Sequence, residues 1–116
     1  MKYMLLIYGD PSLAPKTQAE GEAMHADYGV FTEKIQASGE MQSGDPLQGV
    51  DTATSVRVRD TKTLTTDGPF AETKEQLGGF YIVDVPHLDR ALELAAQCPG
   101  ARYGTIEVRP IMDFGA

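Results

Sequence analysis

Several residue types that commonly signal a chemical site are scarce in this sequence. Its 116 residues include no tryptophan, one cysteine and two histidines. A single cysteine permits neither an internal disulfide nor a thiolate metal site, so Cys98 is expected to be a buried small hydrophobe. The two histidines form no HxxH or HxxE pattern, and GxSxG, P-loop and GxGxxG motifs are absent. We therefore expect no metal and no cofactor.

Positive charge and long apolar runs are also in short supply. The sequence has ten lysines and arginines and seventeen aspartates and glutamates, which gives a net charge of −7. Because nucleic-acid binding draws on a basic surface, no nucleic-acid partner is expected. No stretch approaches the roughly 20 apolar residues of a membrane span, so no membrane partner is expected either. The apolar start, Met1 to Tyr8, runs into Gly9-Asp10-Pro11 rather than a cleavage site, which favours a first strand and a cytoplasmic protein.

A chain of this length is expected to form a single domain, residues 1–116, organised around the stretch Asp67 to Asp84. Gly68 and Pro69 turn the chain there. Beyond Gly78-Gly79, residues 80–85 read as a strand with apolar side chains on both faces, as do residues 2–8. Strands of that kind are typical of the middle of a covered sheet.

Two helices and several weaker strands complete the pattern. Thr17 to Glu20 has the form of a capping box, and an apolar stripe at helical spacing follows it, made of Met24, Tyr28, Phe31 and Ile35. A second helix is expected at residues 88–97. Residues 40–50 are expected to be a loop with at most a short strand at 41–43. Clear alternation predicts a strand at 54–59, which a turn joins to a partner strand at 63–66.

The order of these elements predicts an α+β fold, the ferredoxin-like βαββαβ plan with an antiparallel sheet. The two strands that are apolar on both faces take the central places, and 54–59 and 105–110 take the outer ones. Two helices can cover only one face of such a sheet, so the other face needs a second cover. We expect a homodimer whose sheets pack face to face, a dimeric α/β barrel.

Inward-facing charge gives a first candidate site. If Val56, Val58, Ile106 and Val108 face the helices, Arg57 and Arg109 point toward the space between the sheets. Buried charges are costly unless they are paired or meet a ligand. One interpretation is edge protection with salt bridges to Glu107; the other is an anion pocket in which Arg57 or Arg109 clamps a carboxylate or enolate.

His25 is the second candidate, at the border of the apolar stripe that contains Tyr28. It can be a solvated side chain, or a general base if a carboxylate such as Asp67 orients it. The charged run that starts at Glu72, next to Phe70, reads either as solvated loop or as a binding loop on a rigid scaffold. His87 at the start of the second helix looks structural.

The motif Asp67-Gly-Pro-Phe70, the following Ala-Glu-Thr-Lys-Glu-Gln-Leu-Gly-Gly-Phe80 and the ending Gly104-Thr-Ile-Glu-Val-Arg-Pro110 resemble the DGPF-type branch of the YCII-related proteins. This resemblance covers nearly the whole chain. It implies a bacterial, cytoplasmic dimeric α/β barrel, commonly encoded beside extracytoplasmic-function sigma factors. Some wider YCII-like proteins pair a helix histidine with an aspartate, and one relative is a dehydrochlorinase. By position the pair would be His25 and Asp67.

Three functional hypotheses remain open at the level of sequence. The first is a small-molecule site for an anion or phenol between the dimer sheets, with cofactor-free proton transfer or elimination. Its residues are His25 and Asp67 as the catalytic pair and, for substrate binding, Arg57, Arg109, Tyr28, Phe70 and Glu72. The second is a non-catalytic regulatory protein that works with a sigma factor. The third is a cofactor-free monooxygenase, a chemistry that dimeric α/β barrels also support.

Overall fold

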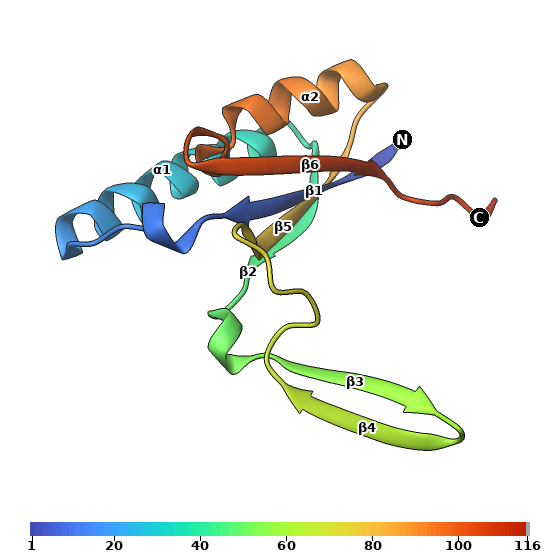
Figure 1. Cartoon of the computed structure of the whole chain (residues 1–116). Coiled ribbons are helices and arrows are strands. Elements are labelled where there is room, and N and C mark those ends of the chain that lie inside the picture. Colours follow the sequence, from blue (N-terminus) through green and yellow to red (C-terminus); the bar gives the residue numbers. More distant parts are fainter. Residues whose placement is uncertain (116) are drawn as a thin grey trace.

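The computed structural model describes residues 1–115 and contains one four-stranded antiparallel sheet, two helices on one of its faces and a separate two-stranded hairpin (Figure 1). The strands are β1 Lys2–Gly9, β2 Met41–Pro46, β3 Thr54–Arg59, β4 Lys62–Asp67, β5 Gln76–Asp84 and β6 Gly104–Pro110. The helices are α1 Gln18–Ala37 and α2 Leu88–Gln97, with short 3-10 turns η1 Pro11–Leu13, η2 Val50–Thr52 and η3 Pro99–Arg102.

The sheet has the strand order β2-β5-β1-β6, and every neighbouring pair is antiparallel. This arrangement is the ferredoxin-like plan that the element order predicts. The two strands predicted to be central, β1 and β5, are the central ones. They are the two strands whose side chains are apolar on both faces, which agrees with a position between two covered surfaces.

The outer strand next to β5 differs from the prediction. It is β2, residues 41–46, whereas residues 54–59 form β3, which pairs only with β4. Val56 and Val58, expected to face the helices, are 61% and 59% exposed. The alternating pattern correctly indicates a strand, but alternation does not specify which strand lies beside it.

The β3–β4 hairpin, residues 54–67, is called the arm below. Its turn places Asp60 and Thr61 at φ of 51° and 66°, the left-handed region that two-residue hairpin turns require. Figure 1 shows the arm standing off the sheet on the side away from the two helices. Nearly all of its side chains are exposed.

The hydrophobic core lies between the sheet and the helices. Tyr3 and Leu5 of β1 and Val83 of β5 point into it and are almost fully buried. Helix α1 contributes Phe31, whose ring meets that of Tyr81 edge to face with centroids 5.3 Å apart. The remaining buried members are Ile35, Val85, Ala91, Leu94, Ala95 and Cys98. Cys98 is free and 1% exposed, so the expectation of a buried cysteine is confirmed.

The opposite face of the sheet carries a second apolar surface, and the helices do not cover it. Met4 pairs with Ile82 and Leu6 with Phe80 in the β1–β5 register, and these four side chains alternate with the core residues. They remain partly exposed. We call these four residues the open face.

The ends of the helices follow local chemistry. Thr17 Oγ1 accepts a hydrogen bond from the Glu20 backbone N–H at 3.1 Å, so the predicted N-cap is confirmed. The Glu20 carboxylate reaches back to the N–H of Lys16 at 2.8 Å, one residue earlier than a standard capping box. His87 caps α2: its Nδ1 accepts from the Arg90 N–H at 3.3 Å, which agrees with the structural role expected for it.

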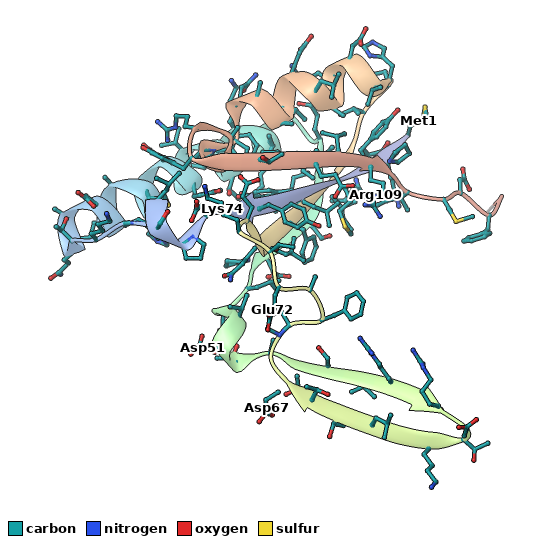
Figure 2. The ribbon with its side chains drawn as sticks, viewed as in Figure 1. Met1, Asp51, Asp67, Glu72, Lys74 and Arg109 are labelled. Carbon is teal, nitrogen blue, oxygen red and sulfur yellow. The ribbon has the colours of Figure 1, made fainter. Side chains whose placement is uncertain are left out.

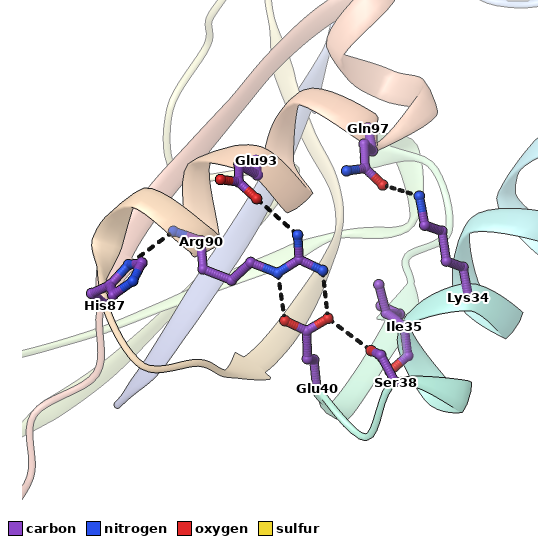
Figure 3. Close-up of polar contacts among 8 residues, drawn as sticks. All are labelled: Lys34, Ile35, Ser38, Glu40, His87, Arg90, Glu93 and Gln97. Carbon is purple, nitrogen blue, oxygen red and sulfur yellow. Dashed lines mark hydrogen bonds and ion pairs between the residues drawn. The ribbon is translucent and has the colours of Figure 1, made fainter.

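An ion pair links α2 to the start of β2. The Arg90 guanidinium donates to both Glu40 oxygens, at 2.7 and 2.9 Å, and Ser38 Oγ donates to the same carboxylate at 2.7 Å (Figure 3). These bonds lower the pKa of Glu40 to about 2, with the Arg90 hydrogen bond as the largest cause. Within residues 1–115, no helix is long and apolar enough to cross a membrane.

Candidate functional site

A groove of about 800 Å³ opens between α1 and the part of the sheet where β1 ends and β5 begins. It lies on the helix-covered side, because Ile7, Gly79 and Tyr81 line it from the core face of the sheet. Helix α1 supplies Met24, His25, Tyr28 and Thr32 as the other wall. The sequence led us to expect a site between two sheets, but the groove in this chain occupies a different position.

Glycines make room for the groove. A Cβ on Gly44 would come within 2.7 Å of the Tyr81 ring, so that ring lies directly over the glycine. A Cβ on Gly100 would lie 2.6 Å from the Tyr28 hydroxyl. These two glycines therefore allow both phenol rings to take their positions at the groove wall.

Two phenol hydroxyls at this wall stay protonated at neutral pH. The Tyr81 hydroxyl lies 2.7 Å from Thr32 Oγ1, and burial raises its pKa. The Tyr28 hydroxyl lies 4.0 Å from the Cys98 sulfur, and burial is again the main reason that its pKa is raised. Burial also raises the pKa of the Cys98 thiol, so the sulfur is not a reactive thiolate. The two tyrosines can donate hydrogen bonds to a ligand oxygen.

Charged and titratable groups reach the same groove. The His25 imidazole lines it from an exposed position on α1. Asp10 lines it from the loop after β1, where Ser12 donates from its backbone N–H at 2.9 Å and from Oγ at 2.8 Å. These bonds lower the pKa of Asp10, the backbone bond most, and Lys74 lies 3.8 Å away. The groove thus contains an imidazole and an ionised carboxylate.

Apolar and aromatic side chains form most of the remaining surface. Tyr8 and Tyr103 are further aromatic residues that line the groove, beside the two phenols of the wall. Aliphatic and thioether groups come from Leu13, Met41, Leu47, Val50 and Leu77. A concave, largely apolar site with a few polar groups is the usual form of a small-molecule pocket, and its aromatic content favours a flat ligand.

The predicted site residues do not form one cluster. His25 and Tyr28 line the groove, whereas the residues that line it do not include Asp67, Arg57, Arg109, Phe70 or Glu72. Figure 2 shows Asp67 at the base of the arm and Glu72 on the connection from the arm to β5. Since His25 lines the groove and Asp67 does not, the pairing of these two residues stays a prediction.

The two candidate arginines are engaged elsewhere. The Arg57 guanidinium lies 5.1 Å from the centre of the Phe70 ring, next to the arm. Arg109 bonds to Glu107 on its own strand, from Nε at 3.0 Å and from Nη2 as well. Arg109 thus fits the salt-bridge interpretation given to it. Arg57 stands on the arm and not on the four-stranded sheet, because β3 pairs only with β4.

Asp10, Thr32 and Tyr81 are the groove residues that sequence reasoning missed. Asp10 stands in a Gly-Asp-Pro turn directly after a predicted strand, and such a turn is a sequence signal for a carboxylate on a loop. The other two carry no such signal, since their closeness depends on how α1 packs on β5. Within residues 1–115, no group of three or more histidine, cysteine, aspartate or glutamate side chains could hold a metal ion.

Comparison with known proteins places this geometry in context. The model of the YCII-related domain matches residues 1–115. An uncharacterised protein of Rhizobium meliloti (strain 1021), R00369, is 36% identical over 114 residues, which cover 96% of this chain and 92% of that protein. Among solved structures, 5-chloro-2-hydroxyhydroquinone dehydrochlorinase (TftG) of Burkholderia phenoliruptrix AC1100, in complex with 2,5-dihydroxybenzoquinone, matches with a TM-score of 0.57. Its sequence identity is 17%, and the match covers 97% of this chain and 94% of that one.

Proposed function

Because the chain belongs to the YCII-related domain family, we propose that it binds a small hydroxylated aromatic compound in the groove between α1 and the sheet and catalyses a cofactor-free elimination on it. The observation that carries the proposal is the composition of one concave site. Two protonated phenols, an imidazole and an ionised carboxylate line the same largely apolar groove. The DGPF-type motif at Asp67 to Phe70 supports assignment to that branch of the family.

The roles of the residues follow from their chemistry. His25 is the general base, because an imidazole nitrogen can take up and return a proton and this residue lines the groove from an exposed position. Tyr28 and Tyr81 are hydrogen-bond donors to the ring oxygens. Asp10, which lines the same groove, takes the place of Asp67 as the carboxylate of the site.

The reaction is balanced without an oxidant. His25 takes a hydroxyl proton, and a proton is added at the ring carbon that bears the leaving group, which gives a keto tautomer. The leaving group then departs with its bonding pair while a second hydroxyl loses its proton and becomes a carbonyl. The net change is loss of one acid molecule, HX, and the product is a quinone.

Two further observations support this reaction class. The fold is that of TftG, whose structure contains 2,5-dihydroxybenzoquinone, a flat compound with two hydroxyls and two carbonyls. The groove also offers hydroxyl donors on its walls and aromatic surface for a ring of that size. A pocket of this volume exceeds what one aromatic ring needs, so substituents on the ring can be accommodated.

A thermal-shift screen against phenols, quinols, their chlorinated forms and small carboxylates tests the proposal. A ligand at about a hundred times its dissociation constant adds roughly 2.7 kcal/mol to the free energy of unfolding. We expect hydroxylated or chlorinated aromatics to stabilise the wild type. Tyr28→Phe and Tyr81→Phe should weaken this shift, and His25→Ala should abolish turnover, measured as quinone absorbance and release of halide.

His87→Asn is the matched control, because it removes an imidazole outside the groove while asparagine can still cap α2. It should bind and turn over ligand as the wild type does. If no compound shifts the wild type, or if His25→Ala retains full turnover, the proposed function is wrong, and the regulatory hypothesis becomes the better one.

We also propose that two copies assemble through the open face. Met4, Leu6, Phe80 and Ile82 form an apolar surface on the two central strands, and the helices of the same chain do not reach it. A closed two-fold dimer covers such a surface with its own equivalent.

A further inference from the structure

The arm, residues 54–67, belongs neither to the groove nor to the open face, and no role has yet been proposed for it. The Cα radius of gyration is 16.2 Å, whereas a compact domain of this length has about 13 Å. An isolated two-stranded hairpin is marginally stable in water at best. A strand pair that stands clear of the sheet therefore needs a surface that covers it.

One face of the arm combines apolar and basic groups. The register places Arg57 opposite Leu64 and Arg59 opposite Lys62, so these four side chains share a face. Phe70 packs on Arg57 and is 77% exposed, and Leu64 is 49% exposed. This set, Arg57, Arg59, Lys62, Leu64 and Phe70, is called the basic face of the arm.

The cations of the basic face lack acidic partners in their own chain. Among residues 1–115, none of the three has a carboxylate within 4.0 Å, although Lys74, Arg90, Arg102 and Arg109 each have at least one. With Asp60 and Asp67 counted, the arm has a net charge of +1. Since the whole chain is −7, the remainder of the chain is −8.

A second copy of this chain fits both observations. Its body has the opposite charge, and α1 alone presents the exposed carboxylates of Glu20, Glu22, Asp27 and Glu33 on its surface. The arm stands on the open-face side of the sheet (Figure 1), which is the side where a second copy would pack. An arm in that position would lie beside a second copy packed on the open face.

We infer that the arm clasps a second copy of this chain, with its basic face against the acidic outer surface of the partner. The inference rests on the proposed packing through the open face and adds a second, electrostatic contact to it. Arg57 and Phe70 are the central contact, because a guanidinium that stacks on an aromatic ring is an effective interface anchor.

Charge reversal measured by sedimentation tests the inference. Arg57→Glu with Arg59→Glu should raise the dissociation constant of the dimer at least about tenfold at low salt. The difference should shrink as salt rises, since exposed charges are screened. Lys16→Glu with Lys34→Glu changes the net charge equally outside the arm, on and next to the acidic helix α1, and should not raise the dissociation constant.

Crosslinking locates the contact of the arm with the second copy, and it does so even if the variant with Arg57→Glu and Arg59→Glu is unstable. A photoreactive maleimide is attached to Leu64→Cys in a Cys98→Ala background, and labelled and unlabelled protein are mixed in equal amounts. We expect crosslinked peptides that join the arm of one copy to the body of another. The same label on Leu92→Cys of α2, 47% exposed and on the helix side, is the control and should give far fewer.

The possible results distinguish the proposed sheet packing from the proposed arm contact. If the wild type is monomeric at micromolar concentration, both the sheet packing and the arm contact are wrong. If it is a dimer that the arm variant does not weaken, and the Leu64→Cys crosslinks stay within one chain, only the arm contact is wrong. Neither result bears on the groove, which the ligand screen tests separately.

Discussion

Single side chains decide how α2 is held to the rest of the fold, and Glu40 is the clearest case. Its carboxylate accepts from Arg90 twice and is 15% exposed, whereas Glu93, which pairs with the same arginine, is 61% exposed. Hydrogen bonds to charged groups contribute more when solvent does not compete for them. Glu40 should therefore contribute far more stability than Glu93.

We predict that Glu40→Gln lowers the free energy of unfolding by about 1–2 kcal/mol at pH 7. Because folding lowers the pKa of Glu40 to about 2 from an ordinary 4.5, this stability is fully present above pH 4.5 and is lost as the pH falls toward 2. Urea unfolding at pH 7 and near pH 2 measures it. Glu93→Gln, the control, should cost less than about 0.5 kcal/mol. Equal losses for the two variants would contradict the assignment.

Individual residues also show how much of the candidate site could be predicted from the sequence. His25 and Tyr28 both line the groove, and helical spacing alone predicts that they lie on one side of α1, at or beside the apolar stripe. Asp67, chosen as the carboxylate, does not line the groove, because nearness in space between a helix and a distant loop leaves no local pattern. Tyr81 and Thr32 likewise meet across 49 positions of sequence.

At the scale of the element, α1 begins where a local rule places it. Thr17→Ala removes the hydroxyl that satisfies the Glu20 N–H and should lower the free energy of unfolding by about 1 kcal/mol. Thr17→Ser keeps the acceptor and should lose less than half of that. Thermal or urea unfolding of the two variants decides the point, and an equal loss for serine and alanine would show that the cap is not the cause.

Helices and strands were predicted well where their own residues determine them. They were predicted poorly where pairing with a neighbouring strand determines them. The helices and the two central strands carry strong periodicity, and their places were confirmed. β2 contains Gly44, Asp45 and Pro46 and has little strand character, so its position at the sheet edge depends on pairing with β5. The arm has the clearer strand pattern yet forms no ladder with the sheet.

For the whole molecule, the open face determines the expected state of association. Leu6→Glu places a charge at the centre of that face and should convert the proposed dimer to monomer at micromolar concentration, because an unpaired charge in an apolar interface is strongly unfavourable. Val30→Glu, on α1 at a position 67% exposed, changes the charge equally and should remain dimeric. Light scattering distinguishes these masses, and a dimeric Leu6→Glu variant would contradict the packing.

The path of the chain into and out of the arm has a consequence for engineering. The chain leaves the sheet at Pro46 and returns to the same point, where Gly79 pairs with Pro46 and the Leu47 N–H donates to the Gly78 carbonyl at 2.9 Å. The sheet closes this loop whatever its contents, and doubling the length of a flexible loop costs only about 0.6 kcal/mol. Residues 48–75 thus form a natural insertion point, where a peptide of another length or purpose can be grafted while β2 and β5 keep their register.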